Sequence, residues 1–165
     1  GHYVDDQPAL VKRMIKDGHI IGNHSDDHID FTTASKEKFT EDVERLTEKI
    51  IKTAPEATVQ YIRPPKGTFN ENSLKWANEL GYIHMFWSVA FVDWNEGEEK
   101  GWEHAYQQVM DQIHPGAIVL MHTVSRDNAE SLEHLIDELR KQGYTFKSLD
   151  DLMLKQLLPD IHDLF

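Results

Sequence analysis

Apolar residues along this chain recur at helical spacing in some segments and form short continuous runs in others. Apolar positions three or four residues apart are typical of a helix packed on a core, and a short apolar run is typical of a buried strand. The helical spacing predicts helices over 5–18, 35–54, 72–81, 101–113 and 128–142. The continuous runs predict strands over 19–22, 58–62, 82–89, 117–121 and 145–147. Helices and strands therefore alternate along the chain.

Residues that favour helix ends mark several of these boundaries. Pro8 suits the first turn of the first helix, and Asn72 is expected to cap the third. Gly18 and Gly81 follow the last turns of two helices. Strands that are apolar on both faces and alternate with helices imply a parallel sheet covered by helices, either open or rolled into a barrel. No linker or repeat interrupts the pattern, so we expect one domain over 1–165.

Size and composition narrow the class of protein. Its 165 residues are enough for one domain, but a complete eightfold barrel usually needs more than about 200. The 17 basic and 29 acidic residues give a formal charge of -12, which disfavours binding to nucleic acid or to an anionic membrane. No apolar stretch approaches the roughly 20 residues of a membrane-spanning helix. Because the chain has no cysteine, a bound metal must use histidine and carboxylate ligands.

Four polar residues stand at or just beyond the carboxyl ends of predicted strands: His24, Arg63, Asp93 and His122. Parallel barrels gather their catalytic groups at this edge, because the strand end is rigid and the following loop gives reach. The placement predicts one active site built from residues remote in sequence.

His24 and His28 are four residues apart, so both imidazoles can approach one metal ion. Neutral imidazole suits zinc, but a third ligand is needed. Asp26 and Asp27 are candidates, although they are equally well explained as solvated turn residues, with the third ligand outside this chain. In a chain with ten histidines, an isolated pair at this spacing is more often accidental.

The other polar residues also have structural explanations. Arg63-Pro64-Pro65 can simply end a strand, because proline fixes its own φ and disfavours helix in the residue before it. An arginine held there would also be well placed to pair with a carboxylate and keep it ionised as a base. Asp93 suits a turn, but behind His122 a carboxylate would orient the imidazole for proton transfer.

Taken in order, four motifs resemble those of the polysaccharide deacetylase family, the metal-dependent carbohydrate esterases. The matches are His-Ser-x-x-His at 24–28, Arg-Pro-Pro at 63–65, Asp-Trp at 93–94 and Leu-x-His at 120–122. Longer stretches at 18–25, 86–94 and 122–130 are similar to the delta-lactam-biosynthetic de-N-acetylases of spore-forming bacteria, a branch of that family. The family's first motif, an acidic pair that supplies the catalytic base and often a metal ligand, has no counterpart here.

The resemblance implies a fold and a set of residue roles. The fold is α/β, a distorted parallel (β/α) barrel, lacking its first strands in this chain, so the domain over 1–165 is expected to be incomplete at its N-terminus. A divalent metal, zinc in preference to cobalt or manganese, would be held by His24 and His28. The remaining roles concern catalysis and sugar binding: His122 as the acid, Asp93 as its orienting partner, Arg63 as the partner of the base, and Trp94, Leu120, Pro64 and Pro65 as walls of the sugar groove.

The implied activity is hydrolytic removal of N-acetyl groups from peptidoglycan, with N-acetylmuramic acid of the spore cortex as the expected substrate on the way to muramic delta-lactam. The implied partner is the glycan strand, the location extracytoplasmic and the protein a monomer that binds no nucleic acid. Alternatives within the family are deacetylation of N-acetylglucosamine or chitooligosaccharides.

Two further classes stay open from the sequence. One is a different metal-dependent hydrolase on a similar barrel, which would bind metal without deacetylating glycan. The other is a glycan-binding remnant that lacks the catalytic base, which would bind no metal. Metal titration separates the two.

Overall fold

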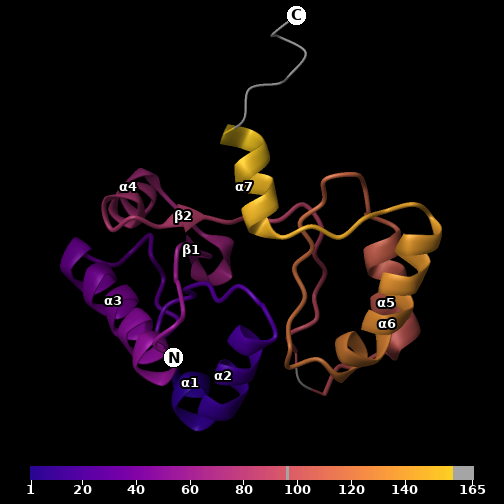
Figure 1. Cartoon of the computed structure of the whole chain (residues 1–165), viewed down its shortest axis with the longest axis horizontal. Helices are drawn as coiled ribbons and strands as arrows, with labels where there is room; N and C mark the ends of the chain where they lie inside the picture. Colours follow the sequence, from indigo (N-terminus) through magenta and orange to yellow (C-terminus); the bar gives the residue numbers. More distant parts are fainter. Residues whose placement is uncertain (96, 158–165) are drawn as a thin grey trace, which may run out of the picture. The chain divides into compact units, whose positions relative to one another are not determined.

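The computed structural model describes residues 1–95 and 97–157, and the chain divides into two compact units, Gly1–Phe86 and Trp87–Phe165. Figure 1 shows the elements coloured along the sequence. The first unit contains α1 (His2–Asp6), α2 (Pro8–Lys16), α3 (Lys36–Thr53), β1 (Tyr61–Ile62), the short 3-10 helix η1 (Pro65–Gly67), α4 (Glu71–Glu79) and β2 (Ile83–His84). The second contains α5 (Trp102–Met110), α6 (Arg126–Lys141) and α7 (Leu149–Leu157).

The helix of the first unit that matters most for the site is α3. Ser35 caps it by accepting a hydrogen bond from the backbone N–H of Lys38, which satisfies one of the orphan donors of the first turn. Its buried face carries Phe39, Val43, Leu46 and Ile50 at the predicted spacing. The helix ends at Thr53, as the following proline predicts.

The predicted cap of α4 is wrong by two positions. Asn70, not Asn72, caps this helix: its side chain accepts from the backbone N–H of Ser73 at 2.9 Å. The Ser73 hydroxyl in turn accepts from the backbone N–H of Asn70 at 3.0 Å, so two donors at the helix end are satisfied reciprocally. Asn72 lies inside the first turn.

Parallel strand pairing organises the first unit. β1 pairs with β2 through Tyr61↔Ile83 and Ile62↔His84. On the other side of β1, Asn23 forms a parallel bridge with Ile62: its N–H donates to the Tyr61 carbonyl at 2.8 Å, and its own carbonyl accepts from the Arg63 N–H at 2.9 Å. The core beneath this pairing consists of Phe31, Phe39, Val43, Ile62, Ala77 and Tyr82.

In the second unit α5 and α6 pack side by side (Figure 1) around a core of Val89, Val109 and Leu135. One parallel bridge joins Val89 to Val119, and the Leu120 N–H donates to the Val89 carbonyl at 2.9 Å. Ser125 caps α6, which therefore begins at Arg126, two residues before the predicted start.

The predicted strands form only short paired segments. Of the run 82–89, Ile83–His84 is strand and Val89 makes a bridge, while 19–22 is extended without strand pairing of its own. The strand predicted over 145–147 is wrong, since these residues form no strand, and α7 directly after them was not predicted. An apolar run predicts burial and extended backbone, but a ladder also needs a partner in register, which the run does not reveal.

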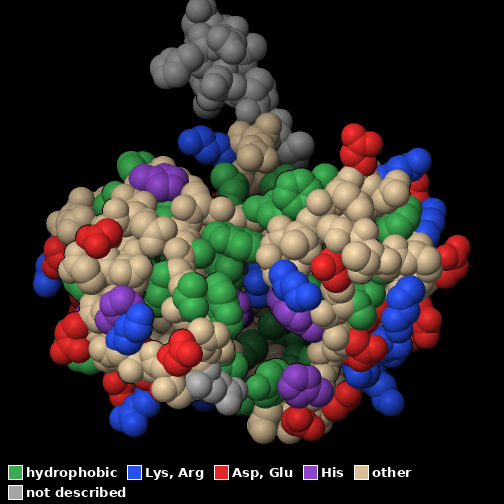
Figure 2. Space-filling view, turned by 180° about the vertical axis from the view of Figure 1, so that it is seen from behind, with side chains coloured by type: hydrophobic (Ala, Val, Ile, Leu, Met, Phe, Trp, Pro, Cys, Tyr) green, Lys and Arg blue, Asp and Glu red, His purple; other side chains and the backbone are tan. Residues whose placement is uncertain are grey.

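Two surface properties bear on function. No helix in residues 1–95 and 97–157 is both long and apolar enough to cross a membrane. On the face shown in Figure 2, acidic and basic side chains are interspersed and form no broad patch of one sign.

Candidate functional site

His24 and His28 lie together in the first unit, directly after the bridge that Asn23 makes with β1. Their ring centroids are 5.1 Å apart and the rings meet edge to face at 78°. His24 Nδ1 lies 2.6 Å from the carbonyl oxygen of Arg63. Because a carbonyl only accepts, Nδ1 carries the proton, and Nε2 is then the nitrogen with the lone pair that a metal needs.

The loop between the two histidines is held by a carboxylate that the sequence did not single out. Asp42 of α3 is fully buried, and its Oδ2 accepts from the Ser25 hydroxyl at 2.6 Å and from the Asp26 N–H at 3.0 Å. Its Oδ1 accepts from the Asp27 N–H at 3.0 Å. The backbone of Ser25 has a φ of 68° and that of His28 a φ of 55°, left-handed values that a non-glycine residue rarely adopts. Asp42 thus fixes an otherwise unfavourable loop conformation.

Asn23 secures the same loop from the strand side. It is buried, and its Nδ2 donates to the Val43 carbonyl at 2.8 Å and to the Thr47 hydroxyl at 2.9 Å, both on α3. Its Oδ1 accepts from the Ser25 N–H at 2.9 Å. Asn23 and Asp42 together tie the histidine loop to α3.

Asp26 and Asp27, the candidates for a third metal ligand, face cations in the structure. Arg45 contacts Asp26 at 2.5 Å and Asp27 at 2.6 Å, and Lys49 lies 2.9 Å from Asp26. Burial of Asp26 favours its neutral form, but hydrogen bonds from Lys49 and Arg45 outweigh burial and lower the pKa of its carboxyl. Asp27 is exposed and suits the solvated-turn interpretation, whereas that interpretation is wrong for Asp26, which is buried.

The donor set fits a metal in part. Two imidazoles at this separation suit zinc, which most often takes three protein ligands in catalytic sites. Within residues 1–95 and 97–157, no group of three or more histidine, aspartate or glutamate side chains is arranged to hold an ion. His24 and His28 would therefore supply two ligands, and within the described part of the chain they are not joined by a third.

Arg63-Pro64-Pro65 follows β1 beside the histidine pair. The Arg63 carbonyl accepts from His24, and its N–H donates to Asn23, so this residue is part of the framework of the histidine loop. Pro64 and Pro65 are less than 2% exposed. Their burial favours a role in supporting the backbone at Arg63 over contact with a sugar.

In the second unit, Asp93 and His122 form a hydrogen-bonded pair. Asp93 Oδ1 lies 2.6 Å from His122 Nδ1, and Oδ2 accepts from the His122 backbone N–H at 2.7 Å. The Asp93 side chain is 1% exposed, whereas that of His122 is 27% exposed. With Nδ1 held by the carboxylate, Nε2 is the position from which the ring exchanges a proton with a ligand.

A third residue completes this pair and was not predicted as functional. Asn128, in the first turn of α6, is buried and donates from Nδ2 to Asp93 Oδ2 at 2.5 Å and to the His122 carbonyl at 2.9 Å. The sequence marks Asn128 only as the start of a helix. No local pattern marks it, because its partners are 35 and 6 residues away in the chain.

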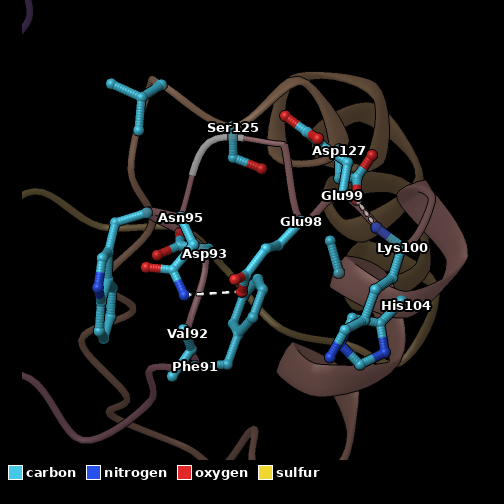
Figure 3. A pocket seen from close by; sticks show the side chains of 13 residues that line it. Phe91, Val92, Asp93, Asn95, Glu98, Glu99, Lys100, His104, Ser125 and Asp127 are labelled. Carbon is cyan, nitrogen blue, oxygen red and sulfur yellow. Dashed lines mark hydrogen bonds between the residues drawn. The ribbon is translucent and has the colours of Figure 1, made fainter.

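An apolar surface lies beside the pair. The Trp94 side chain is half exposed, and its ring meets that of His122 edge to face at a centroid distance of 5.4 Å. Leu120, two residues before His122, is partly buried. Figure 3 shows an adjoining open pocket between the segment that carries Asp93 and the residues that lead into α6. Its polar lining includes Asp93, Asn95, Glu98, Lys100, His104 and Asp127.

The predicted residues therefore fall into two groups. In the first unit His24 contacts both His28 and Arg63, and in the second unit His122 contacts both Asp93 and Trp94. Each group combines one end of a parallel-paired segment with the loop that follows it.

Comparison with known proteins gives one consistent family. The family described as polysaccharide deacetylase matches residues 1–85. The chain is 51% identical over 156 residues to the peptidoglycan-N-acetylmuramic acid deacetylase PdaA of Bacillus subtilis. The aligned region covers 94% of this chain and 59% of that protein. It is 33% identical over 159 residues to a peptidoglycan-N-acetylglucosamine deacetylase of Bacillus cereus, covering 93% of this chain and 72% of that protein.

Solved structures agree with this result. The structure of Bacillus subtilis PdaA, described as a family 4 carbohydrate esterase, is similar with a TM-score of 0.91 at 51% identity, over 94% of this chain and 67% of that one. This likeness confirms the expected fold class, α/β of the polysaccharide deacetylase barrel type. The chain spans about three fifths, 59%, of the length of the curated muramic acid deacetylase.

Proposed function

Because this chain belongs to the polysaccharide deacetylase family, we propose that it hydrolyses N-acetyl groups of peptidoglycan amino sugars in a metal-dependent reaction, with N-acetylmuramic acid as its substrate. The observation that carries the proposal is the pair of Asp93 and His122, a buried carboxylate holding one nitrogen of a solvent-accessible imidazole. This arrangement is suited to delivering a proton to a leaving group.

In the proposed reaction, His24 and His28 hold a divalent cation, zinc in preference to cobalt or manganese. When bound, the cation supplies a Lewis acid that polarises the acetyl carbonyl and lowers the pKa of a water molecule. The carboxylate base that accepts the proton of the attacking water has no counterpart among the matched motifs, and Arg63 is assigned as its partner.

His122 acts at the second half of the reaction. An amine anion is too poor a leaving group to depart unprotonated, so His122 Nε2 gives its proton to the sugar nitrogen as the carbon–nitrogen bond breaks. The hydroxyl of the water stays on the acetyl carbon, and the products are acetate and a free amino sugar. Asp93 stabilises the imidazolium before the transfer and keeps Nδ1 out of the reaction.

Substrate contact is assigned to the exposed face of Trp94, with Leu120 beside His122. An aromatic side chain next to the acid suits the apolar face of a sugar ring. Pro64 and Pro65, which the family resemblance places in the sugar groove, are both buried and are not assigned to substrate contact.

The choice of N-acetylmuramic acid depends on the relatives. Identity is 51% to a muramic acid deacetylase and 33% to a glucosamine deacetylase. In muramic acid the freed amine lies near the lactyl carboxyl, so loss of the acetyl group allows closure to a delta-lactam once no stem peptide occupies that carboxyl. A role in sporulation and an extracytoplasmic location would follow from that substrate.

An acetate-release assay with two glycans tests this proposal. The protein, loaded with zinc, is mixed with peptidoglycan strands stripped of stem peptides and, separately, with chitooligosaccharides. We expect acetate from the muramoyl glycan, loss of release after chelation and recovery on adding zinc. Preference for chitooligosaccharides would favour the other branch of the family, and metal binding without release from either glycan would favour a different hydrolase.

A glycan-binding remnant is distinguished by metal binding itself. Titration calorimetry with zinc should give binding that His28→Ala abolishes and that His19→Ala, at an exposed histidine outside the site, leaves unchanged. No binding by the unaltered protein would support the remnant. The source of the base is tested by the same assay: acetate release by the protein that starts at Gly1 would show that the base lies within this chain.

A further inference from the structure

We propose that Asn128 is a positioning residue for the reaction: it fixes the carboxylate of Asp93 and thereby the ring of His122. The inference rests on the proposed function, in which His122 is the proton donor. It assigns a role to a residue outside the four motifs.

The contacts of Asn128 require an amide in one orientation. Its Nδ2 faces Asp93 Oδ2 at 2.5 Å and the His122 carbonyl oxygen at 2.9 Å, and both of these atoms only accept. The reversed amide would place its oxygen against two oxygens. An aspartate of the same shape would place a second carboxylate there, so the site specifically needs two N–H donors.

The two oxygens of the Asp93 carboxylate accept hydrogen bonds from different donors. Oδ1 receives the Nδ1–H of His122, while Oδ2 receives the His122 backbone N–H at 2.7 Å and the Asn128 amide. Two donors on Oδ2 hold the plane of the carboxylate, so that Oδ1 stays aimed at the imidazole. Without Asn128 a single donor would remain on Oδ2, and the carboxylate could turn.

The backbone of Asn128 is held within its own helix. Its backbone N–H lies 3.3 Å from the Ser125 hydroxyl that caps α6, and the Ser131 hydroxyl donates to its carbonyl at 3.1 Å. The first turn of α6 therefore provides a rigid support for the proton-donating pair.

The unpaired oxygen of the Asn128 amide is evidence against a purely structural role. Asn128 Oδ1 is buried and accepts no hydrogen bond within the described part of the chain. An unpaired buried acceptor is unfavourable, and an apolar side chain at this position would avoid it. The need for donors toward Asp93 and His122 accounts for an amide at this position.

The test measures the tautomer of His122 by nitrogen-15 NMR of its ring, without substrate. At a pH at which the ring has lost its catalytic proton, unaltered protein should show a single neutral tautomer with the remaining proton on Nδ1. Asn128→Asp and Asn128→Ala should both show a mixture with protonated Nε2, whereas Ser131→Ala, which removes a contact of the same residue's backbone, should leave the single tautomer in place. Asn128→Ala leaves the Ser125 cap of α6 intact, so this variant provides the test if Asn128→Asp does not fold.

Kinetics complete the experiment. Asn128→Ala should lower kcat by about 10- to 100-fold with KM nearly unchanged, since a misplaced catalytic group costs up to about 100-fold. An unchanged tautomer in the folded variant would overturn the role of Asn128. If the unaltered protein released no acetate but the Asn128 variants still showed the tautomer change, the proposed function would be wrong and the positioning by Asn128 would stand.

Discussion

Replacement of Asp42 by asparagine tests how the loop of His24 and His28 is held. Asp42 is fully buried, and its two oxygens accept from Ser25 Oγ, Asp26 N–H and Asp27 N–H at 2.6, 3.0 and 3.0 Å. Asparagine keeps the shape but exchanges one oxygen for an amino group. Whichever way the amide turns, that amino group faces a backbone N–H of the loop.

The magnitude follows from these contacts. A hydrogen bond to a charged group contributes about 1.5–3 kcal/mol, and a buried N–H left without an acceptor costs about 1–3 kcal/mol. The pair that Asp42 makes with Arg45 at 3.5 Å adds less than about 1 kcal/mol, because the Arg45 side chain is one third exposed. We therefore expect Asp42→Asn to lower the free energy of unfolding by about 2.5–6 kcal/mol.

The same substitution should weaken metal binding. The left-handed backbone at Ser25 and His28 costs about 1–3 kcal/mol per residue and persists only while its surroundings enforce it. Loss of a residue that orients metal ligands typically lowers affinity about 10- to 100-fold. Zinc affinity measured by titration calorimetry should fall by this factor.

Urea unfolding gives the stability and calorimetry the affinity, with Glu41→Gln as the matched control. Glu41 lies next to Asp42 on α3, its side chain is 69% exposed, and it reaches Arg45 only at 3.6 Å. The control should change stability by less than about 0.5 kcal/mol. If Asp42→Asn behaved like the control in both measurements, the assignment of Asp42 as the anchor of the histidine loop would be refuted.

Further predictions concern the core, a helix cap and the pH dependence of stability. Phe39→Ala should lower the free energy of unfolding by about 3–5 kcal/mol in urea titrations, because Phe39 is fully buried against Phe31 and Trp76. Asn70→Ala should cost about 1 kcal/mol in the same assay through loss of the α4 cap, whereas Asn72→Ala should cost less. Burial lowers the pKa of His84, so the unfolded chain binds a proton below about pH 6.5 that the folded chain resists, and stability should fall as the pH drops through this range. His84→Phe should make that decline shallower, and an unchanged pH profile would contradict the assignment.

Local pattern predicted α3, α4, α5 and α6, but it missed α7 and gave one helix over 5–18 where the structure has α1 and α2. Apolar spacing identified α3 and its buried face, and the expectation that Asp93 holds the ring of His122 agrees with the hydrogen bond found. Both depend on signals within a few residues: periodicity in the first case, and a polar residue after a buried segment in the second.

The features that could not be predicted from the sequence depend on contacts between distant segments. Asp42 resembles any polar residue of a charged helix, yet it is fully buried because the loop 17 residues earlier turns its N–H groups toward it. Asn128 acts on a residue 35 positions away. Strand pairing was overestimated for the same reason, since register is set by the partner and not by the apolar run.

The central claim is that His122, oriented by Asp93, protonates the leaving nitrogen. The most direct measurement compares His122→Ala with unaltered protein on two substrates: an N-acetyl sugar and an aryl acetate, whose phenolate departs without protonation. The account predicts a fall in kcat of about 100- to 10,000-fold on the amide and little change on the ester. An equal loss on both substrates, or no loss on the amide, would contradict it.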